Sequence, residues 1–175
     1  MFSDPEHNIE QFHLRPGMHV ADLGAGSGFY TFAASRALGK EGRVYAVEVQ
    51  KELLERVKTE ATRQGLSNVE VIWGNIEKVG GTKLRELSID AAIVSNVLFQ
   101  TPDKDALAQE AARIVKPKGK VLVVDWADSA TAMGPKGGDR YPAEKARALF
   151  EKFGFAHEED IRAGDHHYGM VLRKS

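Results

Sequence analysis

Three glycines at alternate positions, set between a short apolar run and a second apolar segment, constrain the fold more than any other feature of this chain. Residues 20–30 read Val-Ala-Asp-Leu-Gly-Ala-Gly-Ser-Gly-Phe-Tyr. Glycine permits a tight strand-to-helix turn and lets the backbone approach a ligand that a Cβ atom would hold away. At the end of the first strand of an α/β protein, such a turn indicates a cofactor site.

The hydrophobic pattern predicts seven strands, at residues 18–23, 43–47, 69–73, 89–95, 120–126, 156–162 and 167–173. Helices are expected within residues 1–13 and at 28–38, 51–64, 103–115 and 142–153, with one helical turn around Leu84 in the loop 76–87. Each crossover returns the chain to the same end of the sheet, so the first five strands should be parallel. We therefore predict an α/β fold: a Rossmann-like, doubly wound, mostly parallel seven-stranded sheet with an antiparallel last strand and helices on both faces.

Length and composition restrict the class of protein. A chain of 175 residues fits one domain over 1–175, and the absence of cysteine excludes disulfides, thiolate metal ligands and a cysteine nucleophile. A net charge of −1, with no run of Lys or Arg longer than two, gives no strong nucleic-acid signal. No apolar run approaches the roughly 18 residues that span a membrane, and the polar N-terminus lacks a signal-peptide core. A cytoplasmic location is expected.

An acidic residue at the next strand end narrows the choice of cofactor. Glu48 follows the second predicted strand, where a carboxylate can accept hydrogen bonds from both hydroxyls of an adenosine ribose. A dinucleotide fingerprint would need glycine at position 29 or 31, but the chain has Phe29 and Thr31. No Gly-Lys-Ser/Thr phosphate loop is present either. These residues favour a ligand with adenosine and no pyrophosphate, and they leave an NAD oxidoreductase as a distant alternative.

The motifs at successive strand ends resemble those of class I S-adenosylmethionine-dependent methyltransferases. They are the glycine turn at 22–28, Glu48, Gly-Asn-Ile at 74–76, Asp-Ala-Ala-Ile-Val-Ser-Asn at 90–96 and Val-Lys-Pro-Lys-Gly at 115–119. The sequence is most similar to the broad group that contains the ubiquinone and menaquinone biosynthesis methyltransferases. The resemblance covers nearly the whole chain and implies S-adenosyl-L-methionine as cofactor. It says little about the methyl acceptor.

The resemblance also implies roles for individual residues. Glu48 would bind the ribose, and Val49 and Ile76 would enclose the adenine. Asn75 stands where the family usually has an aspartate that bonds the adenine amino group, and the amide oxygen of Asn75 can accept the same bond. The methionine moiety would be held by Asp22 and the turn. The full implied cofactor set is Asp22, Gly24, Ala25, Gly26, Ser27, Gly28, Glu48, Val49, Asn75, Ile76, Ser95 and Asn96.

Methyl transfer requires a nucleophile aligned opposite the sulfonium leaving group, and it requires a general base only if the acceptor is protonated. Segments 95–99, 125–141 and 164–167 should meet at the acceptor side of the sheet edge. His166 and His167 are the candidate bases, because imidazole titrates near neutral pH, although consecutive histidines also occur in polar turns. Asp125 is a third candidate, as a base, a substrate hydrogen-bond acceptor or half of a metal site with Asn96. No metal is expected.

Several functions remain open from the sequence. The leading hypothesis is methyl transfer to a small-molecule acceptor by direct in-line displacement. The alternatives are a methyltransferase that acts on RNA or protein and a non-catalytic module that binds S-adenosyl-L-methionine. The sequence does not identify the acceptor, and either a monomer or a homodimer fits it.

Overall fold

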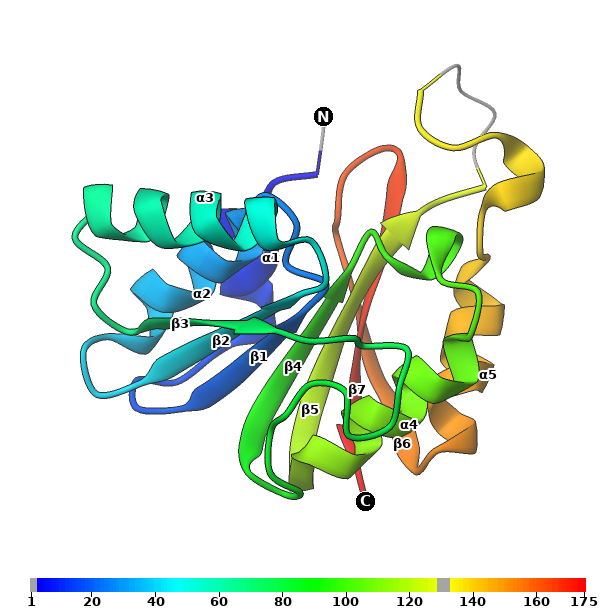
Figure 1. The fold of residues 1–175 in the computed structure, drawn as a ribbon. Coiled ribbons are helices and arrows are strands. Elements are labelled where there is room, and N and C mark those ends of the chain that lie inside the picture. Colours follow the sequence, from blue (N-terminus) through cyan, green and yellow to red (C-terminus); the bar gives the residue numbers. More distant parts are fainter. Residues whose placement is uncertain (1–2, 129–132) are drawn as a thin grey trace.

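The computed structural model describes residues 3–128 and 133–175 of the chain. Its sheet has seven strands in the order β3-β2-β1-β4-β5-β7-β6 (Figure 1). The strands are β1 (His19–Leu23), β2 (Arg43–Glu48), β3 (Val69–Trp73), β4 (Ile89–Ser95), β5 (Val115–Trp126), β6 (Phe155–Ile161) and β7 (His167–Lys174). Strands β1 to β5 pair in parallel, and β7 is antiparallel to both of its neighbours. The predicted fold class is confirmed.

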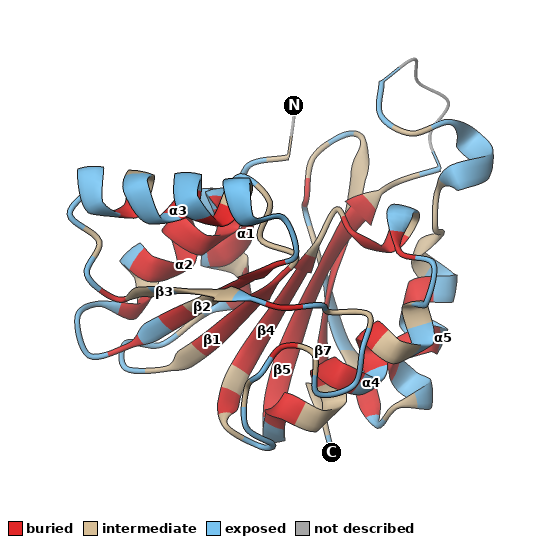
Figure 2. Cartoon of the chain, in the orientation of Figure 1, coloured by how far each residue is buried: buried red, intermediate tan, exposed pale blue. Residues whose placement is uncertain are grey.

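Helices cover both faces of the sheet, and the apolar runs of the central strands divide between them (Figures 1 and 2). One face carries α1 (Pro5–Phe12), α2 (Phe29–Leu38) and α3 (Lys51–Arg63), and the other carries α4 (Lys104–Ile114) and α5 (Ala143–Lys152). Val20 and Ile93 pack in the cluster under α1 and α2, whereas Ala21 and Val94 pack in the cluster under α4 and α5. This two-sided burial explains why these strands are apolar at nearly every position.

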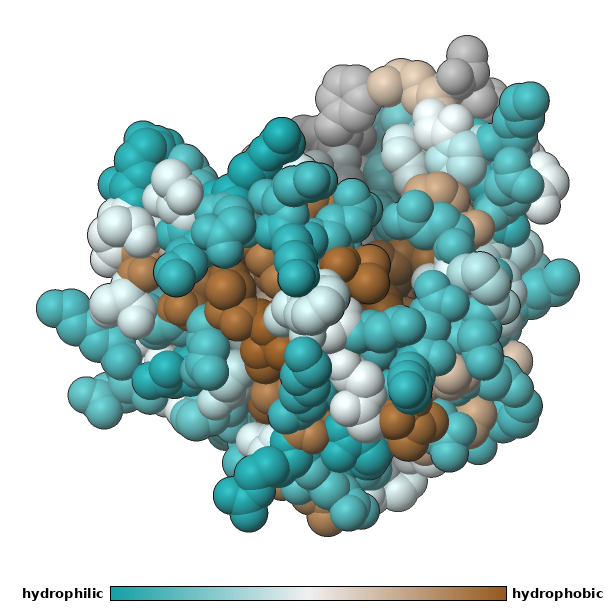
Figure 3. Space-filling model, viewed as in Figure 1, coloured by the Kyte–Doolittle hydropathy of each residue, from teal (hydrophilic) through white to brown (hydrophobic). Residues whose placement is uncertain are grey.

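The third crossover differs from the prediction. Residues 74–88 form turns between β3 and β4, and the helical turn expected around Leu84 is not present. The backbone is left-handed at Gly80, Lys83 and Leu87, with φ of 82°, 61° and 51°, and these conformations interrupt a helix. Trp73, at the start of this connection, is 52% exposed. Figure 3 shows a band of hydrophobic residues across the middle of this face of the molecule.

The fifth strand begins earlier than predicted, at Val115 instead of residue 120. Val115 pairs with Ile89 directly after α4, and the register shifts before Ala91 pairs with Lys120. The shift places Lys118 in the left-handed region, with φ of 66°. A side chain in that conformation costs about 1–2 kcal/mol, whereas glycine adopts it without steric strain.

No helix in residues 3–128 or 133–175 has the length and apolarity that a membrane span requires.

Substitution Lys118→Gly should stabilise the protein. The relief of left-handed strain outweighs the greater entropy of glycine in the unfolded chain, so we expect a gain of about 0.5–1 kcal/mol. Urea unfolding followed by circular dichroism measures it. Lys40→Gly is the matched control, because Lys40 lies in an exposed turn without a positive φ, and there glycine should give no gain. Equal or lower stability of the Lys118 variant would contradict the strain argument.

Candidate cofactor site and acceptor rim

A cavity of about 730 Å³ lies at the carboxyl ends of β1, β2 and β4, within the range of small-molecule sites. All residues of the implied cofactor set line it except Asp22. The strand-end argument therefore brings the right segments together, because the carboxyl ends of parallel strands share one edge of the sheet. The cavity also has lining residues outside that implied set: Ser3, Pro5, Phe29, Tyr30, Val47, Gln50, Leu53, Gly74, Glu77, Val97, Gln100 and Thr101.

The glycine turn has a backbone that side chains would disturb. Gly24, Gly26 and Gly28 have φ of 79°, 55° and 85°, all in the left-handed region. A Cβ atom on Gly24 would lie 2.6 Å from Val97 Cγ1, whereas one on Gly26 would have no neighbour closer than 4.0 Å. Gly24 is thus required because a side chain there would clash with Val97. Gly26 is required because its left-handed backbone favours glycine, although the space beside it is open.

The Glu48 carboxylate connects this turn to the end of β2 through hydrogen bonds. Its Oε2 accepts a hydrogen bond from Gly26 N at 3.0 Å, and its Oε1 accepts from Val49 N at 3.0 Å and Gln50 N at 3.1 Å. Gly24 N and Ala25 N donate to the carbonyl oxygen of Val47 at 2.9 and 3.0 Å. Glu48 therefore shapes the cavity as well as lining it, a structural role that the sequence did not reveal.

Asp22 lies behind the turn as a buried carboxyl group. Its Oδ2 accepts a hydrogen bond from the Thr31 hydroxyl at 2.7 Å, and its Oδ1 has no partner among the described residues. Burial, with a further contribution from the negative charge of Glu48, raises the pKa of Asp22 to about 6. Asn96 Oδ1, at the cavity wall, also lacks a partner in the described part of the chain. Of the two residues, only Asn96 lines the cavity, so its amide oxygen is the unpartnered acceptor nearest to a ligand there.

The wall formed by Asn75 and Ile76 depends on a residue from the other face of the sheet. Asn75 N donates to Gly81 O at 3.0 Å, and Asn75 Oδ1 accepts from Glu77 N at 2.9 Å. Glu110 of α4, fully buried, accepts from Gly80 N at 2.7 Å. Its carboxylate also binds the Thr82 hydroxyl at 2.6 Å and Arg113 Nη2 at 2.7 Å. The ion pair between Glu110 and Arg113 thus supports this loop, which contains no helix.

The N-terminal segment forms another part of the cavity rim. Tyr30, nearly buried at the start of α2, accepts a hydrogen bond on its hydroxyl from Asn8 Nδ2 at 2.7 Å. The Ser3 hydroxyl lies 3.3 Å from the same oxygen. Ser3 and Tyr30 both line the cavity. Tyr30 follows the glycine turn in the sequence, and this position was the one sequence signal for its contact with the N-terminal segment. No motif in residues 1–13 indicated that they form part of a site.

The candidate catalytic residues lie beside this cavity and are not among its lining residues. Asp125 is fully buried, and its oxygens accept from Leu98 N at 2.9 Å and Trp126 N at 2.8 Å. Burial raises the pKa of Asp125 to about 6. In this arrangement Asp125 holds the backbone at the end of β4.

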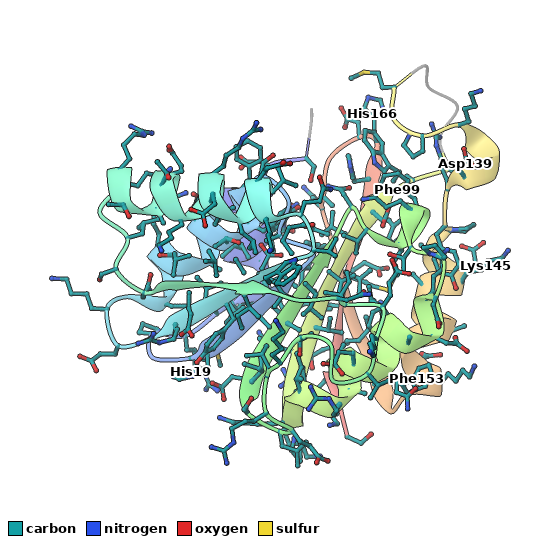
Figure 4. All side chains as sticks on the ribbon, viewed as in Figure 1. His19, Phe99, Asp139, Lys145, Phe153 and His166 are labelled. Atoms are coloured by element: carbon teal, nitrogen blue, oxygen red, sulfur yellow. The ribbon has the colours of Figure 1, made fainter. Side chains whose placement is uncertain are left out.

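The two histidines lie on the hairpin between β6 and β7. His167 stacks on Trp126 with ring centroids 4.3 Å apart, and the Nδ1 atoms of His166 and His167 have no partner within the described residues. Burial and the neighbouring His166 lower the pKa of His167, which favours the neutral imidazole that a base requires. Figure 4 shows His166 and Phe99 at the same edge of the sheet, above the ends of β4, β5 and β7.

Substitution Asp22→Asn should change the pH dependence of stability. The pKa of Asp22 is about 6 in the folded protein against 3.8 for an exposed aspartate, so the folded state binds more protons between these values and loses stability as pH rises. This difference corresponds to about 3 kcal/mol at most. Asparagine keeps an acceptor for Thr31, so the variant should gain stability over the wild type above about pH 6 and gain little near pH 4.

Urea unfolding at a series of pH values measures the effect of this substitution. Asp139→Asn, at an exposed position, is the control and should leave the pH profile unchanged. A parallel pH profile for wild type and the Asp22 variant would contradict the raised pKa.

Comparison with known proteins identifies the family. The family model described as "Methyltransferase domain" matches residues 14–154. An arsenite methyltransferase of Aquipseudomonas alcaligenes is 33% identical over 124 residues, which are 68% of this chain and 36% of that protein. The ubiquinone/menaquinone biosynthesis C-methyltransferase UbiE of Shewanella frigidimarina is 31% identical over 121 residues, 69% of this chain and 47% of that protein. The chain thus spans less than half the length of either relative.

A solved structure extends the similarity to the whole fold. The S-adenosylmethionine-dependent methyltransferase from Aquifex aeolicus superposes with a TM-score of 0.90 at 26% identity, over 99% of this chain and 91% of that one. The match therefore extends over nearly the whole seven-stranded fold. The chain belongs to the class I S-adenosylmethionine-dependent methyltransferase family.

Proposed function

We propose that this protein transfers the methyl group of S-adenosyl-L-methionine to a small organic acceptor by direct in-line displacement. The observation that carries the proposal is the cavity at the carboxyl edge of the sheet, where the glycine turn, Glu48, Asn75 and Asn96 meet. When bound, the cofactor supplies a methyl group activated by a sulfonium. The protein then has to bind, orient and desolvate the reacting groups.

We propose an orientation for the cofactor in the cavity, and the unpartnered buried acceptors support it. We assign the unpartnered oxygens of Asp22 and Asn96 to the cationic methionine moiety, because each can accept a hydrogen bond that nothing in the described residues supplies. Glu48 lies at the ribose position with capacity to accept further hydrogen bonds. Val49, 58% exposed, and Ile76 offer apolar surface for the adenine. The turn 24–28, Asn75 and Ser95 complete the proposed set.

The acceptor side is assigned to the rim beyond β4 and β5. We propose that neutral His167, or His166 beside it, takes a proton from an acceptor that is protonated at neutral pH. Asp125 would contribute by holding Leu98 and Trp126 in place through their backbone N–H groups. Its action as a base would require these hydrogen bonds to break.

An organic acceptor is favoured over a metalloid. The Aquipseudomonas alcaligenes relative is named an arsenite methyltransferase, and the Shewanella frigidimarina relative is named a ubiquinone/menaquinone biosynthesis C-methyltransferase. Soft ions such as trivalent arsenic favour thiolate ligands, and these 175 residues contain no cysteine. The half-buried rings of Trp126 and His167, 4.3 Å apart and tilted by 36°, are instead aromatic groups that suit contact with an organic acceptor.

A second candidate function follows from the position of the proposed bases. His166, His167 and Asp125 do not line the cofactor cavity as the described residues form it. This observation fits a module that binds S-adenosyl-L-methionine without turnover. Cofactor binding and methyl transfer must therefore be measured separately.

Calorimetric titration with S-adenosyl-L-methionine, with NAD as the control ligand, tests the cofactor assignment. We expect the wild type to bind the first and not the second. Glu48→Ala removes a ribose acceptor and leaves Gly26 N and Val49 N without their partner, so affinity should fall by about tenfold or more. Glu52→Ala, on the exposed first turn of α3, is the matched control and should bind normally. Unchanged affinity of the Glu48 variant would remove Glu48 from the site.

Transfer of a labelled methyl group from the cofactor to the small-molecule fraction of a cell lysate tests the activity. His167→Phe keeps a ring against Trp126 and removes both nitrogens, so turnover should fall by about 100-fold while cofactor affinity is unchanged. His166→Gln reports on the second histidine, and His7→Gln on exposed α1 is the control. Label in RNA or protein alone would reject the small-molecule acceptor. Cofactor binding without any transfer would favour the non-catalytic module.

A further inference from the structure

A second cavity, of about 540 Å³, lies at the opposite edge of the sheet, where the parallel strands begin. Segments that are distant in the sequence form it: the end of α1 and the turn after it, the start of β4, residues 116–120 and the end of β7. Its lining residues are His13, Arg15, Met18, Asp90, Lys116, Pro117, Lys118, Gly119, Lys120 and Arg173. The cofactor cavity shares none of them.

The lining of this second cavity is strongly cationic, in a chain whose net charge is −1. Five of its residues are Lys or Arg, and Asp90 is its one carboxylate. Asp90 is already engaged, since Oδ1 binds Lys116 Nζ at 2.8 Å and Oδ2 accepts from His19 N at 2.8 Å. Arg173 is paired with Glu158 of β6, through Nη2 and Oε1 at 2.8 Å. The carboxylates of Asp90 and Glu158 are thus paired with two of the five cations.

The other three cations have no carboxylate partner among the described residues. Arg15 and Lys118 form no ion pair there. Lys120 is only 9% exposed, and its Nζ donates to the carbonyl oxygens of Phe12 and His13 at the end of α1. Burial, together with the positive charges of Arg173 and Arg15, lowers the pKa of Lys120, against the opposing charges of Glu158 and Glu159. Lys120 thus places a buried amine at the base of the cavity, and Arg15 and Lys118, unpaired in the described part of the chain, lie at its rim.

Lys118 occupies a position that is unfavourable for any side chain. Its φ of 66° is left-handed, and Arg173 Nη1 holds its carbonyl oxygen at 2.8 Å. Gly119 fixes the next residue, because a Cβ there would lie 2.8 Å from the Asp90 carbonyl oxygen. The turn is thus held in a conformation that suits glycine, yet it carries a lysine at the cavity. Backbone strain of this kind often occurs at functional sites, which makes the Lys118 side chain a candidate for a function.

We propose that this cavity binds the phosphate group of a small phosphorylated molecule, with Arg15 and Lys118 as its direct ligands above the buried charge of Lys120. Arginine and lysine without carboxylate partners match a doubly charged oxyanion, and the planar guanidinium can bind two of its oxygens. The cavity has room for a molecule larger than phosphate itself, which favours a phosphate ester. The site is separate from the cofactor cavity and does not depend on the methyl-transfer proposal.

Chemical-shift titration of ¹⁵N-labelled full-length protein tests the proposal, with ribose 5-phosphate and inorganic phosphate as separate probes and ribose as the uncharged control. We expect saturable shifts at the amides of residues 116–120 with both anions, tighter for the ester, and none with ribose. Binding of inorganic phosphate alone would limit the site to the free ion and reject the ester. The absence of saturable shifts with either anion would overturn the proposal.

Two variants separate specific binding from general charge effects. Arg15→Gln and Lys118→Gly should each weaken ribose 5-phosphate binding by about tenfold, because each removes one charge-assisted contact. The Lys118 variant should remain folded, since glycine suits its backbone, so lost binding cannot be attributed to unfolding. Lys40→Gly removes the same charge from another exposed turn and should bind normally. Equal weakening in all three variants would show nonspecific attraction and reject the site.

Discussion

The attachment of the glycine turn to the end of β2 is the interaction on which the rest of the site depends. Two backbone N–H groups of the turn bind Val47 O, and a third binds the side chain of Glu48. Glycine at position 24 allows this arrangement, because a Cβ atom there would lie 2.6 Å from Val97 Cγ1. The turn continues the pairing of β1 with β2 beyond Leu23 and Val47, so the shape of the cofactor cavity is tied to the sheet edge.

Much of the fold could be predicted from the sequence, because two-sided burial leaves a simple pattern. Ala21 and Val20 face opposite layers of helices, and both positions must be apolar. The errors arose where contacts distant in the sequence decide the local structure. Pairing of Val115 with Ile89 extends β5 backwards, and left-handed residues such as Lys83 and Leu87 prevent a helix in the third crossover.

The cofactor site likewise combines residues that local sequence patterns predict with residues that reach it through contacts distant in the sequence. Glu48, Asn75 and Asn96 could be assigned because each follows a parallel strand, and such positions meet at one edge. Ser3 and Glu110 could not, since they reach the site through contacts with Tyr30 and with the loop after Asn75. The basic cavity was invisible for the same reason, because Arg15, Lys118 and Arg173 are neighbours only in the folded chain.

The helix-free crossover has a consequence for the motions of the protein. A helix in this place would carry its own ladder of hydrogen bonds, but residues 76–87 depend on the buried carboxylate of Glu110 and its partner Arg113. Burial alone would raise the pKa of Glu110, yet the hydrogen bonds from Arg113 and Thr82 lower it, so the group stays charged. The ion pair of Glu110 and Arg113 thus stabilises the wall of the cofactor cavity that Asn75 and Ile76 form. Because few contacts hold this wall, its local opening costs less free energy than separation of the paired strands beneath it.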